Sequence, residues 1–168
     1  IDVNGKGLLL TTKECLLSKT QQRNSFLKRK DYNFIFKKFF GVKKVIWLNK
    51  GIAGDDTHGH VDDIARFVKS NKVFLAYENN KKDENFKNLD ENLKILKKIK
   101  IGSSQIKIIK IPMPRPIYIN KFRVPASYLN FYIFNKFVFL PTFKDPKDKK
   151  VIKIFKKEFG NRKIVPID

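Results

Sequence analysis

The chain repeats one order of elements three times, and this repeat limits the possible folds more than any other feature of the sequence. Each copy predicts two strands, a helix that ends near a glycine, and a returning strand. The copies cover residues 1–50, 51–116 and 117–168, a period of about 60 residues that exceeds those of common solenoids. Since such units bury a helix on strands and share a core with their neighbours, we predict a single α/β domain of repeated ββαβ units. Ordinary α/β alternation without an internal repeat is the alternative.

The expected elements follow from apolar runs and from the residues that end them. In the first copy they are strands at 2–6 and 7–12, a helix at 31–40 before Gly41, and a strand at 42–48. In the second copy they are strands at 60–68 and 73–77, a helix at 86–99 before Gly102, and a strand at 106–111. In the third copy they are strands at 127–134 and 137–140, a helix at 146–159 before Gly160, and a strand at 162–167. Lysine and asparagine fill the outer face of the second helix, and the aromatic residues over 34–40 are interpreted as core.

Composition excludes several classes of protein. With 168 residues, 42% of them hydrophobic, the chain is long enough for one sizeable core. A single cysteine excludes an internal disulfide framework and favours a reducing, cytoplasmic compartment. No apolar run approaches the roughly 20 residues of a membrane span, so we expect no membrane association. The start at Ile1 lacks a methionine and reads like the middle of a strand and turn, which indicates a piece of something longer.

The formal net charge of +21 raises a nucleic-acid-binding module as an alternative function of a different class. Only six of the 37 basic residues are arginine, however. Nucleic-acid binders more often concentrate arginine, because its guanidinium makes bidentate contacts to phosphates and guanines. We therefore interpret most of the lysines as solvated surface and expect no nucleic-acid partner.

An acidic, histidine-bearing island over 55–63 is the leading candidate for an active site. It holds both histidines of the chain and four of its sixteen acids, with no lysine or arginine. These ionisable residues are Asp55, Asp56, His58, His60, Asp62 and Asp63. In so basic a chain, such an island is where a cationic ligand would be held. An imidazole beside carboxylates is also suited to proton transfer near pH 7.

The spacing of His60 and Asp62 sharpens this hypothesis. If a strand begins near His60, alternate side chains share a face, and the two residues lie side by side with Cα atoms about 7 Å apart. Two alternatives stay open: a polar loop whose carboxylates cap backbone N–H groups, or a metal site formed by His58, His60 and Asp62. Since the chain has no further histidine, we expect no metal.

Four blocks of sequence resemble the agmatine deiminases, in the order in which that family carries them. Residues 54–67 resemble its Asp-Thr-Asp-Gly-His-Ile-Asp segment, and residues 10–17 resemble its Thr-Thr-Glu-Glu-Cys-Leu-Leu block. Residues 45–48 and 125–131 match two more blocks. These enzymes belong with the bacterial-type peptidylarginine deiminases, in the guanidino-group-modifying superfamily. The resemblance implies about three blades of a five-bladed α/β propeller built of ββαβ units.

The resemblance also implies a reaction. Agmatine and water would give N-carbamoylputrescine and ammonia, a step of putrescine biosynthesis that needs no cofactor, with peptidyl-arginine or free arginine as the alternative substrate. In the family a cysteine thiolate attacks the guanidinium carbon to form a thiouronium ester. A histidine protonates the departing amine and then activates water. By motif match His60 takes this general acid/base role and Asp62 clamps the guanidinium nitrogens, with Asp56 as a further substrate-binding candidate. His58 stands where the family has Asp, Asn or Ser, and is not expected to be catalytic.

Two parts of the family's active site are not expected within the chain. The nucleophile lies in a Gly-Gly-x-x-His-Cys segment beyond the position of Asp168, and a second acidic clamp and a Glu-Gly-Gly segment lie upstream of Ile1. The chain would then carry half an active site and be inactive alone. Cys15 aligns with a different block and is interpreted as a buried packing residue.

Overall fold

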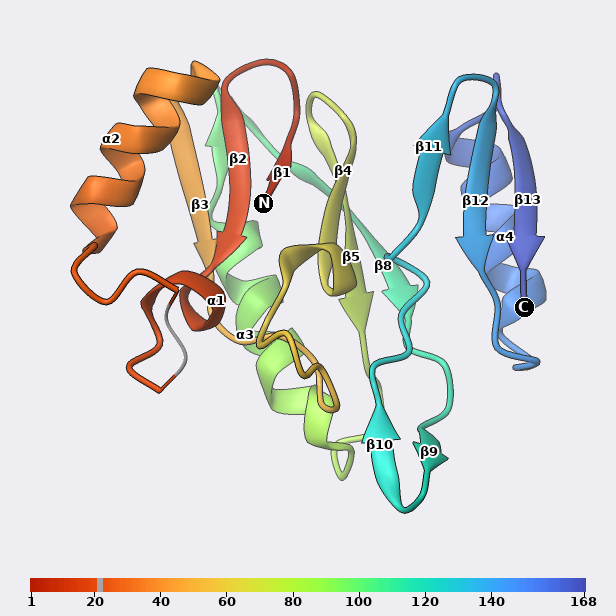
Figure 1. Cartoon of the computed structure of the whole chain (residues 1–168). Coiled ribbons are helices and arrows are strands. Elements are labelled where there is room, and N and C mark those ends of the chain that lie inside the picture. Colours follow the sequence, from red (N-terminus) through yellow and green to blue (C-terminus); the bar gives the residue numbers. More distant parts are fainter. Residues whose placement is uncertain (21–22) are drawn as a thin grey trace.

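Three sheets of three strands form the fold, as the repeat predicts (Figure 1). The computed structural model describes residues 1–20 and 23–168. The first sheet holds β1 (Asp2–Val3), β2 (Leu8–Thr12) and β3 (Lys44–Leu48). The second holds β4 (Ala65–Lys69), β5 (Lys72–Tyr77) and β8 (Lys107–Pro112), and the third holds β11 (Tyr132–Phe134), β12 (Phe137–Pro141) and β13 (Lys163–Ile167). In each sheet the first two strands pair antiparallel and the last two pair parallel.

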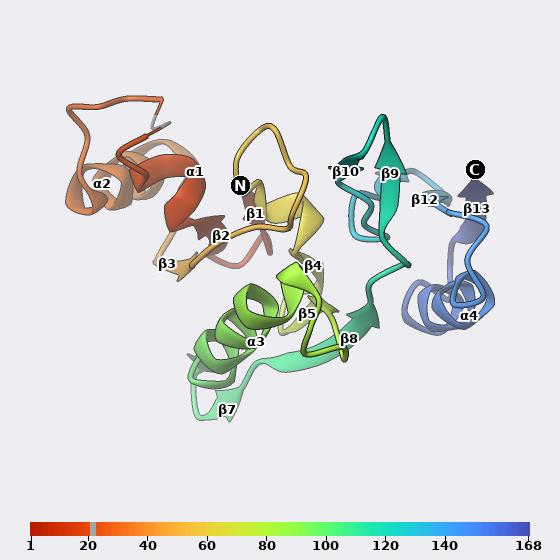
Figure 2. The same cartoon turned by 90° about the horizontal axis from the view of Figure 1, so that it is seen from below.

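Each parallel pair is joined through a helix, which completes the ββαβ order. The joining helices are α2 (Arg29–Phe40), α3 (Glu84–Lys97) and α4 (Asp148–Glu158). The remaining elements are α1 (Lys13–Leu17), the 3-10 turn η1 (Val61–Asp63), and the hairpins β6 (Lys100–Ile101)–β7 (Ser104–Gln105) and β9 (Ile117–Ile119)–β10 (Phe122–Val124). The predicted α/β class and its three ββαβ units are confirmed, and the units follow one another in chain order (Figure 2). None of the helices in the described residues is long and apolar enough to cross a bilayer.

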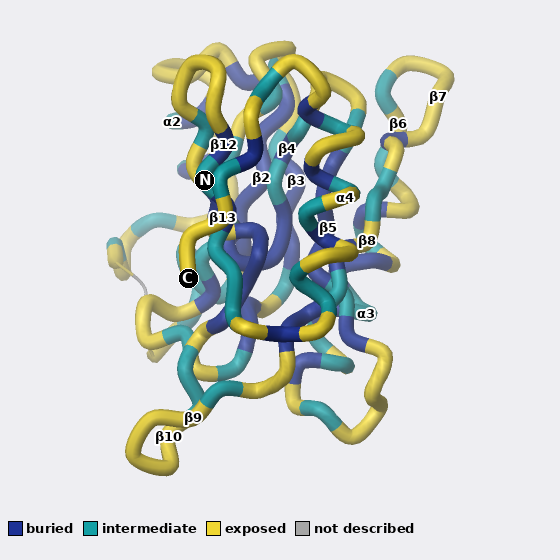
Figure 3. Tube along the Cα trace, turned by 90° about the vertical axis from the view of Figure 1, so that its right-hand side faces the viewer, coloured by how far each residue is buried: buried dark blue, intermediate teal, exposed yellow. Residues whose placement is uncertain are grey.

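The two faces of β2 serve two cores, because alternate side chains of a strand point in opposite directions. Leu9 packs with Phe36 and Trp47 beneath α2. Leu8 and Leu10 face the other way and join a large cluster that runs through all three units. Burial follows the strands, whereas the tip of the β9–β10 hairpin is exposed (Figure 3).

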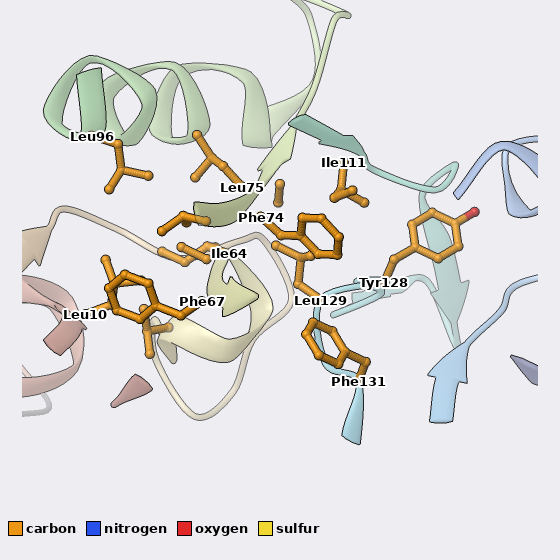
Figure 4. Packing of buried hydrophobic residues seen from close by; sticks show 14 of the residues in the cluster. Leu10, Ile64, Phe67, Phe74, Leu75, Leu96, Ile111, Tyr128, Leu129 and Phe131 are labelled. Atoms are coloured by element: carbon orange, nitrogen blue, oxygen red, sulfur yellow. The ribbon is translucent and has the colours of Figure 1, made fainter. Parts of the chain in front are cut away.

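Aromatic rings join the second unit to the third. The ring of Phe74 on β5 lies 4.8 Å from that of Phe155 on α4, between ring centroids. Phe131, just before β11, lies 5.1 Å from Phe155 in an edge-on arrangement. These rings belong to the large cluster, in which Phe74 and Phe131 pack near Leu129 and Ile111 (Figure 4). The units are therefore not independent, because one apolar core holds them together.

The predicted strand at 60–68 is wrong at its start. His60 lies outside any strand, Val61–Asp63 form the turn η1, and the strand begins only at Ala65. The cause is local: the Asp55 carboxylate accepts hydrogen bonds from backbone N–H groups of the island, which bends the chain away from an extended path. The side-by-side strand geometry expected for His60 and Asp62 does not occur.

Two interpretations of helical faces also need correction. Asn85 and Asn92 of α3 are buried rather than solvated, because both bind backbone groups described below. Of the aromatic residues over 34–40, Phe36 is buried, whereas Phe34, Phe39 and Phe40 are exposed. A helix offers one stripe to its sheet, so aromatics spread around its circumference cannot all be core.

The glycines near the ends of the second and third helices also play other parts than predicted. Gly102 lies in the turn between β6 and β7 with a positive φ of 60°, after α3 has already ended at Lys97. Gly160 follows the C-cap residue Phe159 and does not have a positive φ. Gly41 does close α2 in the left-handed conformation, as predicted.

Candidate active site

Asp55 organises the acidic island. One carboxylate oxygen accepts from the backbone N–H and hydroxyl of Thr57, and the other accepts from the backbone N–H groups of Gly59 and His60 at 2.7 and 3.0 Å. Burial opposes ionisation of this carboxyl, but the hydrogen bonds outweigh it and lower the pKa of Asp55. Asp55 is therefore a structural anion that fixes the backbone at His60.

Residues 11–15 pack against the acidic island and are hydrogen-bonded to it. The Thr12 hydroxyl donates to the carbonyl of Gly59 at 2.5 Å and accepts from the backbone N–H of Cys15 at 3.0 Å, so it joins α1 to the island. The Glu14 carboxylate accepts from the backbone N–H of Gly51 at 2.7 Å. Gly59 has a positive φ of 79°, and a Cβ there would lie 2.6 Å from Glu14 Oε2. Only glycine fits this close approach.

Two buried asparagines of α3 hold the segment that leads into the island. Asn92 Oδ1 accepts from the backbone N–H of Asn49 at 2.8 Å, and its Nδ2 donates to the carbonyl of Lys50 at 2.8 Å. Asn85 Oδ1 accepts from the backbone N–H of Ala53 at 2.6 Å. These bonds satisfy backbone groups that would otherwise be buried without a partner, and they tie the entry of the island to the second unit.

His60 and Asp62 line one pocket of about 250 Å³. Its other lining residues are Ile1, Thr11, Cys15, Leu16, Arg23 and Val61. The two predicted site residues are thus brought together, although by a turn rather than by a strand. A larger hollow of about 440 Å³ lies on another side of α1 and contains neither histidine, so the smaller pocket is the candidate for chemistry.

Cys15 is half-buried and lines this pocket, so the full burial predicted for it is wrong. Its position at the third residue of α1 turns its side chain towards the side on which His60 and Asp62 lie. Burial raises the pKa of the Cys15 thiol, with Asp55 and Asp62 adding to the increase and Arg23 opposing it. A thiol of raised pKa is a poor nucleophile near neutral pH.

Asp63 is a buried carboxyl beside the site. The sequence placed it in the acidic island but indicated no role for it. Its Oδ1 accepts from Asn130 Nδ2 at 3.2 Å, and its carbonyl accepts from the Ser127 hydroxyl at 2.6 Å. Burial, reinforced by Asp62 and Asp55, raises the pKa of Asp63 to about 7. The block over 125–131 thus holds η1 from the third unit. No periodicity or spacing in the sequence could reveal a contact between residues so far apart.

Arg66 joins all three units just behind the site. Its Nε donates to Asp2 Oδ1 in the first unit at 2.9 Å. Its Nη1 donates to the carbonyls of Leu129 and Phe131 in the third unit at 3.3 and 3.1 Å, and its guanidinium lies over the Phe131 ring. Because Arg66 follows η1 by three residues, these bonds anchor the end of the segment that carries His60 and Asp62.

The other predicted site residues lie away from the pocket. Asp56 is exposed and is not among the residues that line it. His58 is exposed, with a positive φ of 66° in the turn that precedes Gly59. Within residues 1–20 and 23–168, no three side chains of His, Cys, Asp or Glu converge as metal ligands. The geometry therefore lends no support to the alternative of a metal site centred on His58.

Solved structures of deiminases share this fold. A C. jejuni agmatine deiminase with substrate bound matches with a TM-score of 0.91 at 34% identity, covering 99% of this chain and 48% of that chain. An Enterococcus faecalis agmatine deiminase matches with a TM-score of 0.87 at 28% identity, covering 99% and 50%. The shared fold defines the class of the molecule, an α/β protein with the fold of the deiminases.

Sequence comparison narrows the class to one family. The profile of the family described as Porphyromonas-type peptidyl-arginine deiminase matches residues 1–168. A Medicago truncatula agmatine deiminase is 33% identical over 189 residues, which cover 100% of this chain and 50% of the relative. The chain belongs to the Porphyromonas-type peptidyl-arginine deiminase family, and the resemblance drawn from its four blocks is confirmed. The chain spans about half the length of the curated relatives it matches.

Proposed function

We propose that the protein hydrolyses a guanidino group, with agmatine as the favoured substrate and N-carbamoylputrescine and ammonia as products. The observation that carries this proposal is the shared pocket of His60 and Asp62 in a member of this family. Relatives named agmatine deiminases favour agmatine over free or peptidyl arginine. The reaction uses no cofactor, and it would serve putrescine biosynthesis in the cytoplasm.

The roles follow from the chemistry of the groups. Asp62 receives the guanidinium, because a carboxylate accepts two parallel N–H donors. His60 protonates the departing amine and afterwards takes a proton from the attacking water. The family resemblance implies that the cysteine thiolate that forms the thiouronium ester lies outside residues 1–168, and the raised pKa of the Cys15 thiol is consistent with this. Residues 1–168 alone are then inactive, and Asp56 contributes at most to attracting the cation.

Ammonia release by the full-length protein tests this proposal. Agmatine, free arginine and an arginyl peptide are compared as substrates, and agmatine is expected to give the highest kcat/KM. His60→Ala is expected to lower kcat by about 10²- to 10⁴-fold, the usual contribution of a general acid/base. The matched control His58→Ala and the variant Cys15→Ser should retain activity, and a chelator should have no effect. Absence of ammonia from all three substrates, or turnover that survives His60→Ala, would refute the proposal.

A further inference from the structure

Arg23 makes a contact with His60 that the proposed reaction does not use. Its Nη2 lies 2.7 Å from His60 Nε2, and both side chains line the 250 Å³ pocket. A guanidinium is always charged and can only donate hydrogen bonds. Nε2 must therefore accept, which makes the imidazole neutral with its proton on Nδ1. In this arrangement the lone pair of His60 is covered by Arg23.

Neither side chain has another partner among the described residues that would hold it in this place. No carboxylate there forms an ion pair with Arg23. The His60 imidazole has no other hydrogen-bond partner in that part of the chain, since Asp55 binds only its backbone N–H. Asp62 likewise forms no ion pair with a described residue, so its carboxylate remains open to a substrate. The charge of Arg23 does act within the pocket, because it opposes the rise in the pKa of Cys15.

His60 cannot keep its hydrogen bond with Arg23 and act as a general acid or base at Nε2 at the same time. As a general acid His60 carries protons on both ring nitrogens, and an N–H on Nε2 cannot accept from Arg23. As a general base His60 must take a proton at the lone pair that Arg23 covers. Either step therefore requires Arg23 to withdraw, and the acid step also requires Nε2 to take up a proton once it is uncovered. A cationic substrate held by Asp62 would bring a second guanidinium into the same small pocket, and repulsion between like charges would favour that withdrawal.

We propose that Arg23 is a specificity-determining residue, an internal guanidinium that covers His60 until a cation occupies the pocket. This inference rests on the proposed function. A neutral ureido group would not repel Arg23, so hydrolysis of the substrate cation restores the covered state. Arg23 thus acts through His60, by covering its lone pair, and competes with the substrate for the pocket.

Steady-state kinetics of the full-length protein with agmatine test the proposal through Arg23→Met, Arg23→Lys and the distant control Arg162→Met. Arg23→Met is expected to lower KM about two- to fivefold with kcat unchanged, because an exposed polar contact contributes less than about 1 kcal/mol. Arg23→Lys keeps the charge and is expected to restore most of the wild-type KM. Arg162→Met should match the wild type. A lower kcat at unchanged KM in Arg23→Met, or no change in either constant, would overturn the proposal.

A spectroscopic measurement separates this inference from the proposed function. Nitrogen-15 NMR of the imidazole groups reports which ring nitrogen carries the proton, and His58→Gln assigns the signals of His60. The wild type is expected to show the Nδ1–H tautomer at His60, and guanidinium chloride at millimolar concentration should disturb it, whereas urea should not. Arg23→Met should remove this difference. If the protein deiminates no substrate but this pattern holds, only the proposed function fails; identical responses to guanidinium and urea contradict the role of Arg23.

Discussion

Asp55 and Asp63 flank His60 at similar distances along the chain, yet the fold treats the two carboxyls in opposite ways. Asp55 accepts hydrogen bonds from three residues within five positions of itself, and its pKa is lowered. Asp63 receives its side-chain bond from Asn130, 67 residues away, and burial beside Asp62 raises its pKa to about 7. One carboxyl is held as an anion by its own loop. The other is held by the third unit in buried surroundings that favour the protonated carboxyl.

The comparison shows that the site depends on two kinds of contact. The backbone at His60 is bent by local hydrogen bonds to Asp55, to which Thr12 adds one contact from the first unit. The position of η1, and with it Asp62, depends on Ser127 and Asn130, which reach the island only when the third unit is folded. Substitutions at the two aspartates should therefore affect stability with opposite dependence on pH.

The largest effect is expected from Asp63→Asn at high pH. The Asp63 pKa of about 7 lies above the value of about 3.9 for an unfolded chain. The carboxyl therefore contributes stability that is fully present below about pH 4 and is lost as pH rises through 7. Three pKa units correspond to as much as about 4 kcal/mol. The wild type should lose that free energy of unfolding between pH 4 and pH 8 relative to Asp63→Asn. Denaturant unfolding of both proteins at several pH values measures the difference, and parallel pH curves would contradict the assignment.

Asp55→Ala should destabilise the protein by about 2 to 3 kcal/mol at pH 7, because it leaves partly buried N–H groups without their charged acceptor. Asp56→Ala is the matched control: this neighbour is exposed, and a change within about 0.5 kcal/mol is expected. The lowered pKa of Asp55 means that its contribution is present above the unfolded value and is lost as pH falls through the folded value. The difference in free energy of unfolding between Asp55→Ala and the wild type should therefore become smaller towards pH 3. A difference of constant size would show that Asp55 acts through packing instead.

The smallest effect is expected from Asn130→Ala, which removes one long-range hydrogen bond to Asp63 and should cost about 1 kcal/mol. Since this bond lowers the pKa of Asp63, its loss should move the pH-dependent step of unfolding to higher pH. Asn120→Ala, in the exposed turn of the β9–β10 hairpin, serves as a control that should leave this step in place. If the pH-dependent step of unfolding is unchanged in Asn130→Ala, the hydrogen bond from the third unit does not influence the pKa of Asp63.

The same division explains how much the sequence could predict. Hydrophobic periodicity predicted the ββαβ units, because it is set by neighbouring residues, although of the three glycines predicted as helix stops only Gly41 closes its helix. The composition of the island predicted where the pocket lies. The turn at η1 was missed because the Asp55 carboxylate binds the backbone in a way that strand alternation does not anticipate. The burial of Asn85 and Asn92 was missed because polar residues on a helix are solvated unless a distant backbone segment needs their amides. Asp63 and Arg23 became visible only once the fold brought Asn130 and His60 to them.

Arg66 has a consequence for how the chain reaches its fold. Its partners Asp2, Leu129 and Phe131 lie 64, 63 and 65 residues away in sequence, so its bonds close two long loops in opposite directions. Contacts of such separation must overcome loop-closure entropy before they return any energy, and topologies rich in them fold slowly. During synthesis Asp2 emerges before Arg66, whereas the carbonyls of Leu129 and Phe131 emerge only after about 60 further residues. We therefore expect the two bonds to the third unit to complete the anchor of the segment bearing His60 only after that unit has been made.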